Sequence, residues 1–195
     1  MCLELFEIIA PVYGLFYEYQ KKYYNTVVAG IQKELDLSAY KSIIDIGCGT
    51  GALCSVLHQR GLSVTGIDPS QRMLNIAMKK PENKEIDFVR ANALQKLPFA
   101  DRSFDISIAS YVAHGLKEQE RKLMYAQMSR LSKQLVIIYD YNGNRSAFTN
   151  IIERLEGGDY FNFIQNIKSE LEEYFGVIKV IDVDSRAAWY ICNCA

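Results

Sequence analysis

The sequence lacks an excess of charge of either sign and lacks a long hydrophobic run. Among its 195 residues, 22 Lys and Arg stand against 23 Asp and Glu, which leaves a formal net charge of −1. That balance does not supply the broad basic field typical of nucleic-acid binders. No apolar run approaches the ~20 residues that a membrane-spanning helix needs. We therefore expect neither nucleic acid as a partner nor membrane insertion.

Histidine is scarce, and cysteine occurs in an odd number. The chain has two histidines and five cysteines, and an odd count argues against a disulfide framework and favours a cytoplasmic location. The pair Cys192 and Cys194 offers too few ligands for a metal site, since His58 and His114 lie far away in the sequence. We therefore predict no metal. The opening MCLELFEIIA carries two acids and no basic group, so it does not predict a secretory leader.

What the chain does have is a regular alternation of strand-like and helical segments. Apolar residues make up 49% of the composition, which is enough for a core, and the length suits one domain. Strands are predicted at Ser42–Ile46, Ser63–Ile67, Ile86–Arg90, Phe104–Ser110 and Gln134–Asp140. Helices are predicted at Ala52–Gln59, Ser70–Lys79 and Lys117–Leu131. Such alternation predicts a parallel sheet with helices on both faces.

The two ends of the chain read differently. Apolar residues at three- and four-residue spacing predict a helix over residues 3–29, with interruptions at Pro11 and Gly14. After the fifth strand, helices are predicted over 145–156 and 162–174. Strands follow at Val177–Val183 and Ala187–Cys192, and the three residues between them allow only an antiparallel hairpin. We therefore expect an α/β, doubly wound, mostly parallel seven-stranded sheet with an antiparallel C-terminal hairpin. Residues 1–195 form one domain, with an N-terminal helical cap (1–29) and a helical cover (141–175).

The stretch IIDIGCGTGALC, residues 43–54, places glycines at positions 47, 49 and 51, directly after the first strand. Glycine weakens a strand, so three in alternation need a reason. In open α/β sheets, ligands bind beyond the carboxyl ends of the strands. Glycines there let a ligand approach the main chain, and the N–H groups of the following helix add donors. The loop therefore predicts a nucleotide-like ligand.

The spacing of these glycines discriminates between nucleotide classes. It departs by one residue from the dinucleotide pattern G-x-G-x-x-G, which disfavours a nicotinamide-dependent oxidoreductase without removing it as an alternative. No lysine follows Gly51, so the phosphate-binding P-loop pattern is absent and phosphoryl transfer loses support.

Three motifs together carry a resemblance to a known family. They are Asp45–Gly51 (DIGCGTG), then Gly66-Ile67-Asp68 with the PSQRML that follows, and Leu97–Asp105 (LPFADRSFD). In this order and spacing the chain resembles the class I S-adenosylmethionine-dependent methyltransferases, in the small-molecule branch (methyltransferase type 11) that includes the ubiquinone and menaquinone biosynthesis enzymes. The resemblance covers nearly the whole chain and implies a Rossmann-like fold with S-adenosyl-L-methionine as cofactor.

The resemblance also implies which residues hold that cofactor. Asp68 would accept hydrogen bonds from the ribose hydroxyls of the cofactor. Asp45 would organise the glycine loop or pair with the ammonium group at the cofactor's amino-acid end. Asn92 stands where the family often has an acid that touches the adenine, and an amide can replace it there. The full set is Asp45, Gly47, Cys48, Gly49, Gly51, Asp68, Pro69, Met73, Asn92, Ala93, Leu94 and Ser110. For Asp45 a pure loop-capping role stays open, as does helix capping for Asp68.

The sequence defines the residues that would contact the methyl acceptor less well than those that would hold the cofactor. The N-terminal stretch FEIIAPVY resembles a family segment that folds over the cofactor, but Gly14 replaces its acid. Tyr13 and Tyr17, four residues apart, are expected to share a helix face. His114 is a candidate general base and Tyr13 a second candidate catalytic residue, although packing roles stay open for both. The candidate substrate residues are Tyr17, Tyr111, Tyr141, Tyr160, Phe161 and Phe163.

These inferences predict an S-adenosylmethionine-dependent methyltransferase (EC 2.1.1.-) that acts on a small, partly apolar or aromatic molecule. The expected partner is that methyl acceptor, and the expected assembly is a monomer or homodimer. Because Gly14 and Asn92 depart from the family pattern, a cofactor-binding protein without turnover stays as an alternative.

Overall fold

The structure, a computed structural model, describes residues 3–142, 159–176 and 178–194. The helix predicted over 145–156 lies outside the described residues. The chain divides into two compact units, Cys2–Pro98 and Phe99–Ala195, and each is described by itself.

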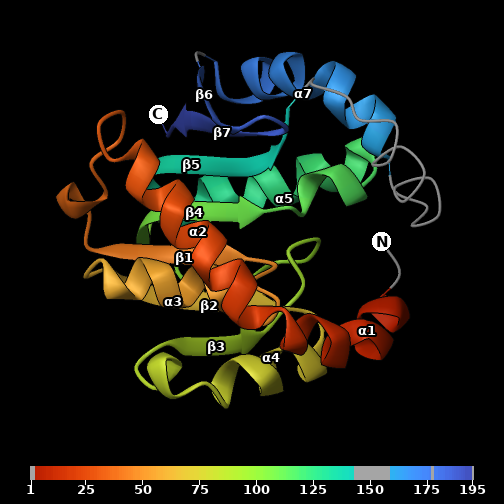
Figure 1. The fold of residues 1–195 in the computed structure, drawn as a ribbon. Helices are drawn as coiled ribbons and strands as arrows, with labels where there is room; N and C mark the ends of the chain where they lie inside the picture. Colours follow the sequence, from red (N-terminus) through yellow and green to blue (C-terminus); the bar gives the residue numbers. More distant parts are fainter. Residues whose placement is uncertain (1–2, 143–158, 177, 195) are drawn as a thin grey trace. The chain divides into compact units, whose positions relative to one another are not determined.

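The first unit contains three parallel strands and the helices that cover them (Figure 1). Its strands lie in the order β3-β2-β1, with Asp45 beside Gly66 and Asp68 beside Arg90. Its elements are α1 (Leu3–Leu15), α2 (Tyr17–Ile31), η1 (Leu37–Ala39), β1 (Ser42–Ile46), α3 (Ala52–Gln59), β2 (Ser63–Asp68), α4 (Gln71–Met78), η2 (Pro81–Asn83) and β3 (Asp87–Arg90).

Burial explains why β1 is an apolar run in the sequence. Ile43, Ile44 and Ile46 are at most 1% exposed, as expected for a parallel strand that is covered on both faces. Ser70 caps the start of helix α4, and its hydroxyl accepts a hydrogen bond from the N–H of Met73 at 3.2 Å. That cap satisfies one of the donors that every helix start leaves without a partner.

The N-terminal helix breaks at a place the sequence does not predict. It separates into α1 and α2 at Phe16, whereas Pro11 lies inside α1. A proline lacks the N–H that would bond the carbonyl four residues earlier. That carbonyl, of Glu7, instead accepts a hydrogen bond from Arg72 of α4 at 3.0 Å. A side chain from another element thus compensates for the proline, and the helix continues through it.

The second unit contains four strands, in the order β4-β5-β7-β6. Strands β4 and β5 are parallel, whereas β7 runs antiparallel to both β5 and β6. Its elements are β4 (Phe104–Ser110), η3 (Ala113–Gly115), α5 (Glu118–Leu131), β5 (Ser132–Tyr141), α7 (Tyr160–Phe175), β6 (Ile178–Asp184) and β7 (Ala187–Asn193). Its core includes Tyr139 and Trp189, both fully buried.

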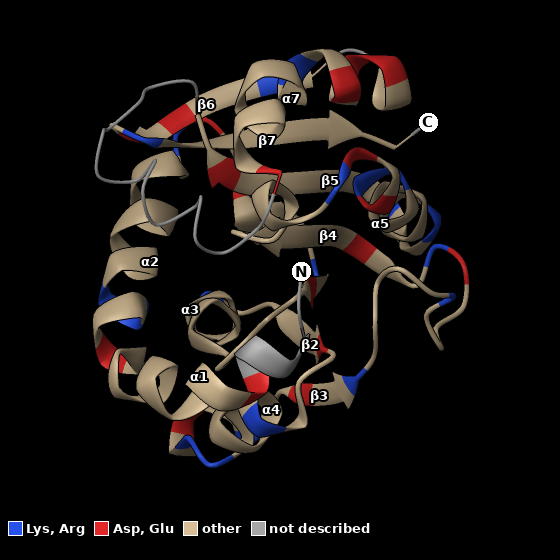
Figure 2. Cartoon of the chain, turned by 90° about the vertical axis from the view of Figure 1, so that its right-hand side faces the viewer, with Lys and Arg blue, Asp and Glu red and all other residues tan. Residues whose placement is uncertain are grey.

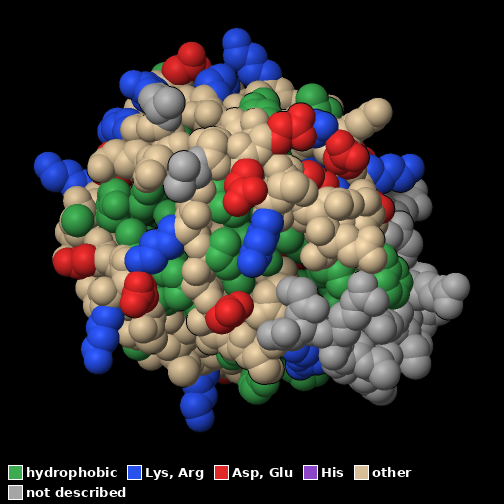
Figure 3. Space-filling model, turned by 90° about the horizontal axis from the view of Figure 1, so that it is seen from above, with side chains coloured by type: hydrophobic (Ala, Val, Ile, Leu, Met, Phe, Trp, Pro, Cys, Tyr) green, Lys and Arg blue, Asp and Glu red, His purple; other side chains and the backbone are tan. Residues whose placement is uncertain are grey.

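The strands confirm the expected fold class. The described residues form the seven strands of a mostly parallel sheet, and the last two of these strands form the expected antiparallel hairpin. Within the described ranges, no helix is both long enough and apolar enough to pass through a bilayer. Residues of both charge signs occur on α5 and on α7 (Figure 2), and charged and apolar side chains are mixed on the face drawn in Figure 3.

Candidate functional site

The glycine loop after β1 holds its three glycines in the left-handed region of backbone space. Their φ angles are 74° at Gly47, 53° at Gly49 and 77° at Gly51, where other residues are strained. The N–H groups of Gly47 and Cys48 both donate to the carbonyl of Ile67, at 2.8 and 2.9 Å. The loop is thereby fastened to the carboxyl end of β2, and the alternation of glycines follows from its backbone conformation.

Two of these glycines serve different purposes. A Cβ placed on Gly51 would lie 3.0 Å from atoms of Ala77, Asn83 and Phe88, so this glycine permits close packing. A Cβ on Gly49 would meet no atom within 4 Å. Gly49 therefore presents bare main chain to open space, the property that a ligand lying against the backbone needs.

Asp68 connects the loop to the next helix. Its Oδ2 accepts a hydrogen bond from the N–H of Gly49 at 3.0 Å, and its Oδ1 accepts one from the N–H of Ser70 at 2.8 Å. The side-chain cap of α4 is Ser70, so Asp68 is not the capping residue. A carboxylate has about four acceptor positions, which leaves capacity for a ribose diol. Burial raises the pKa of Asp68, and hydrogen bonds to the anion oppose that effect.

Asp45 is almost completely buried, with 1% exposure. Its Oδ2 accepts a hydrogen bond from the thiol of Cys54 at 3.2 Å, and its Oδ1 has no hydrogen-bond partner among the described residues. Burial, with a smaller contribution from the charge of Asp68, raises the pKa of Asp45 to about 7. Burial likewise raises the pKa of the neighbouring Cys48 to about 11, so that thiol stays protonated. A buried carboxyl with an orphaned oxygen suits a cationic ligand group.

The segment after β3 adjoins the same strand end. The N–H of Ala91 donates to the carbonyl of Asp68 at 3.2 Å, and the side-chain oxygen of Asn92 accepts a hydrogen bond from the N–H of Leu94 at 3.0 Å. Asn92 thus shapes a turn with its oxygen, while its NH₂ group remains a potential donor. The first unit therefore brings the glycine loop, Asp68 and the Asn92 turn together at the carboxyl ends of its strands. Ala93 lies within this turn, Pro69 follows Asp68 directly, and Met73 is buried in α4.

The expected shared helix face of Tyr13 and Tyr17 is wrong, because the helix breaks between them. Tyr13 is 36% exposed on α1, whereas Tyr17 is fully buried on α2. The Tyr17 hydroxyl donates to Glu82 at 3.3 Å, and Lys80 lies 4.0 Å from its ring centroid. Burial raises the pKa of Tyr17 to about 12. These are the contacts of a packing residue, and its substrate role stays a prediction.

In the second unit, aromatic rings gather around a buried histidine. We call Tyr111, His114, Tyr141, Tyr160 and Phe163 the His114 cluster. The ring centroid of His114 lies 4.9 Å from that of Tyr141 and 6.5 Å from those of the other three. The members come from the loop after β4, the end of β5 and the start of α7. Ser110 ends β4 directly before this loop, and Phe161, 39% exposed, packs edge-on against Tyr160.

Tyr111 has a strained backbone. Its φ of 54° is in the left-handed region, which a bulky residue rarely adopts. Its N–H donates to the carbonyl of Tyr139 on β5 at 2.8 Å, which holds the conformation. Strain of this kind concentrates where a side chain must be aimed for function. The strained turn directs the chain from β4 into the His114 cluster.

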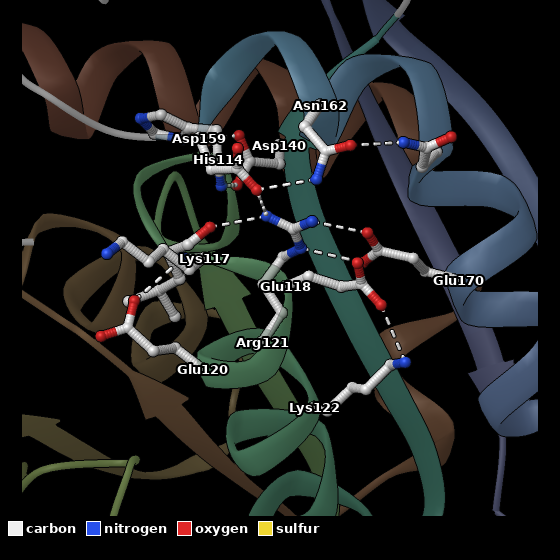
Figure 4. Close-up of polar contacts among 12 residues, drawn as sticks. His114, Lys117, Glu118, Glu120, Arg121, Lys122, Asp140, Asp159, Asn162 and Glu170 are labelled. Carbon is white, nitrogen blue, oxygen red and sulfur yellow. Dashed lines mark hydrogen bonds and ion pairs between the residues drawn. The ribbon is translucent and has the colours of Figure 1, made fainter.

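Asp140, a residue that the sequence interpretation did not select, binds His114 twice. Its Oδ1 lies 2.8 Å from Nδ1 of His114, and its Oδ2 accepts the His114 backbone N–H at 3.2 Å (Figure 4). Its Oδ1 also accepts the N–H of Tyr141 at 2.8 Å, and Asp140 is fully buried. One signal was present, since an acid at the carboxyl end of a buried strand needs a partner.

A second buried group that the sequence did not reveal holds the loop of His114 in place. Arg121, fully buried on α5, donates to Glu170 through Nε at 2.8 Å and to Asp159 at 3.2 Å (Figure 4). It also donates to the carbonyl of Leu116, two residues after His114, at 2.6 Å. This network ties the loop to α5 and α7.

The known proteins that this chain resembles are methyltransferases. Residues 43–134 match the family model described as a methyltransferase domain. The demethylmenaquinone methyltransferase of Chlorobaculum tepidum is 30% identical over 176 residues, which cover 78% of this chain and 68% of that protein. A ubiquinone/menaquinone biosynthesis C-methyltransferase of Campylobacter jejuni is 31% identical over 70% of this chain, which spans 62% of that protein's length.

A solved structure shares the fold. The crystal structure of a putative S-adenosyl-L-methionine-dependent methyltransferase from Methanococcus maripaludis aligns with a TM-score of 0.68 at 18% identity. The alignment covers 95% of this chain and 92% of that one. At this identity the likeness shows the fold, which is the expected Rossmann-like α/β architecture.

Proposed function

Since the chain belongs to the class I S-adenosylmethionine-dependent methyltransferases, with ubiquinone and menaquinone biosynthesis enzymes among its relatives, we propose that it methylates a small, partly apolar or aromatic molecule. The observation that carries this proposal is the His114 cluster, in which four aromatic rings surround one buried histidine. Such a lining suits a flat acceptor.

S-adenosylmethionine, the cofactor, supplies a methyl group on a sulfonium. We assign its nucleoside to the bare main chain at Gly49, to Asp68 and to the turn from Asn92 to Leu94. The orphaned oxygen of Asp45 is assigned to the cationic amino-acid end, which would stabilise the charged carboxylate. The loop presents a fixed main-chain surface for this purpose, because the N–H groups of Gly47, Cys48 and Gly49 are held by Ile67 and Asp68, and it needs no reorganisation of flexible side chains.

We assign the acceptor to the second unit, with Tyr111, Tyr141, Tyr160 and Phe163 as its aromatic lining and His114 as its polar group. For methyl transfer, positioning does much of the catalysis, because the sulfonium is already an activated donor. Three other residues are weaker candidates for contact with the acceptor. Tyr17 is buried by packing, and Tyr13 and Phe161 are partly exposed.

Several further features belong to the same proposal. We infer one methyltransferase domain over residues 1–195, with 1–29 as a cap; the cover predicted over 141–175 lies partly outside the described residues. The four described cysteines are all free thiols, which supports a cytoplasmic location. The protein is a monomer or homodimer whose partner is a small molecule.

The test is transfer of labelled methyl from S-adenosylmethionine to a panel of aromatic phenols, quinols, amines and thiols, with glycerol and ethanolamine as small polar acceptors. We expect product with at least one aromatic acceptor and none with the polar ones. Asp68→Ala should abolish transfer, whereas Asp87→Ala, an exposed acid on β3, should leave it unchanged. Binding of S-adenosylhomocysteine without transfer to any aromatic compound would instead favour a binding protein without turnover.

A further inference from the structure

Helix α1 is apolar on two opposite faces, and one of them packs against α4 (Figure 1). A Cβ placed on Gly14 would lie 3.3 Å from the side chain of Ile76, and Ala10, one turn earlier, is fully buried. Arg72 of α4 adds the hydrogen bond to the carbonyl of Glu7. Because this face already has its partner, the apolar residues on the other face are not needed to attach α1 to the first unit.

The other face carries a row of exposed large apolar side chains that continues onto the start of α2. Their exposed fractions are 69% for Ile8, 52% for Val12, 83% for Leu15, 55% for Phe16 and 72% for Tyr19. We call these five residues the α1 stripe. A helix that is apolar on all sides is normally buried, and monomeric proteins rarely expose large contiguous apolar patches. We therefore expect a partner to cover the stripe.

The spacing within the α1 stripe is that of a seam between two helices. Intervals of four, three and four residues separate Ile8, Val12, Leu15 and Tyr19. This is the spacing of the a and d positions in coiled coils, which turns a row of side chains toward a second helix. The break at Phe16 is short, because its carbonyl already accepts a hydrogen bond from the N–H of Gln20 at 2.9 Å. The stripe is therefore shaped to receive a helix.

We propose that the α1 stripe is the interface of a two-fold homodimer, in which the stripe packs antiparallel against the same stripe of a second copy. In this register Ile8 opposes Tyr19 and Val12 opposes Leu15, so that a smaller side chain meets a larger one. Two-fold dimers, which use one patch on both copies, are the commonest oligomers. Five large side chains, each more than half exposed, offer on the order of several hundred Å² per copy, and a standard interface buries ~800 Å² per partner.

The charges beside the stripe favour a second copy over a lipid surface. Helix α1 carries no Lys or Arg, and α2 carries only Lys21 and Lys22. Lys21 already pairs with Glu82 at 2.5 Å and with Glu18 at 3.6 Å. Helices that lie on a bilayer are rich in Lys and Arg, and recognition of anionic lipid uses clusters of about four to eight such residues. A nearly neutral stripe instead lets two identical faces approach without strong like-charge repulsion.

Light scattering coupled to size exclusion tests the dimer without cofactor or methyl acceptor. We expect the unaltered protein to have twice the 22.2 kDa mass of one chain. Leu15→Glu places a carboxylate against the apolar face of the second copy and should raise the dissociation constant at least ~100-fold. Leu123→Glu, at a residue of α5 that is 52% exposed, makes the same change away from the stripe and should leave the dimer intact. Circular dichroism should show both variants folded, because both residues are exposed.

A second set of variants tests the antiparallel register. Val12→Glu alone should also separate the two copies. Adding Leu15→Lys should recover at least ~tenfold of the lost affinity, because each new carboxylate then faces a new ammonium of the other copy. Adding Leu123→Lys instead gives the same net charge, but the new ammonium lies away from the stripe and should recover nothing. Equal recovery by the two lysines would contradict the antiparallel register.

Three other results would overturn the proposal. One is a single-chain mass for the unaltered protein at every concentration, and another is a dimer that Leu15→Glu leaves intact. The third is flotation of the unaltered protein, but not of Leu15→Glu, with vesicles of phosphatidylethanolamine and phosphatidylglycerol, which would assign the stripe to a lipid surface. None of these measurements reads methyl transfer, so the proposed function is tested separately.

Discussion

The two units of the chain build their functional residues in opposite ways. In Cys2–Pro98, the candidate cofactor site is made mostly of main chain: three glycines with positive φ, two N–H groups fastened to Ile67, and one carboxylate that crosses from β2. In Phe99–Ala195, the His114 cluster is made of side chains from three separate segments, which meet at His114. A backbone site leaves a local mark in the sequence, whereas a site of distant side chains leaves almost none.

The largest expected effect tests how strongly the second unit depends on such distant side chains. Arg121→Met removes the partner of two acids and leaves Glu170 buried without a counter-charge. Breaking a buried ion pair in this way costs ~3–5 kcal/mol. Urea denaturation should show that loss in the free energy of unfolding. Lys122→Met, an exposed neighbour on the same helix, should leave it essentially unchanged.

The second prediction separates two glycines of the backbone site. Gly51→Ala combines left-handed strain with three contacts at 3.0 Å and should cost ~2–4 kcal/mol of stability. Gly49→Ala carries only the strain, ~1–2 kcal/mol. Gly49→Ala should nevertheless weaken cofactor binding by about tenfold, because its Cβ covers the bare main chain. If both variants lost the same stability, our division of roles between packing and ligand approach would be wrong.

The third prediction concerns pH and the buried carboxyl of Asp45. Its pKa is raised to about 7, so the fold favours the neutral form, and that stability is lost as the pH rises through about 7. Asp45→Asn stays neutral throughout. Without cofactor, the two proteins should have similar stability near pH ~4, and the variant should be more stable by ~1–3 kcal/mol near pH ~8. Melting curves at both pH values check this, and a constant difference would contradict it.

The smallest effect is expected at the start of α4. Ser70→Ala removes the side-chain acceptor for the N–H of Met73 and should cost ~1 kcal/mol. Ser70→Asp, which can also cap, should restore most of that loss. A loss much above ~2 kcal/mol on thermal denaturation would mean that Ser70 has a role beyond the cap.

The same contrast explains what the sequence could predict. Helix Ala52–Gln59 and strand Phe104–Ser110 have the predicted bounds, because apolar periodicity and glycine punctuation are local signals. The helix was expected to be interrupted at Pro11 and Gly14, but it breaks at Phe16. It continues through Pro11 because the Glu7 carbonyl bonds Arg72, which lies 61 residues after the proline and leaves no local signal. The Asp140–His114 pair was missed for a similar reason. Its members are 26 residues apart, and only the parallel pairing of β4 with β5 brings them together.

The glycine loop and Asp68 as holders of the cofactor are the central claim, and calorimetric titration with S-adenosylhomocysteine tests it most directly. We predict that the unaltered protein and Asp87→Ala bind it alike, whereas Asp68→Ala binds at least about tenfold more weakly, since it loses an acceptor for the ribose and the anchor of Gly49. Equal binding by Asp68→Ala, or no binding by the folded, unaltered protein, would contradict the account.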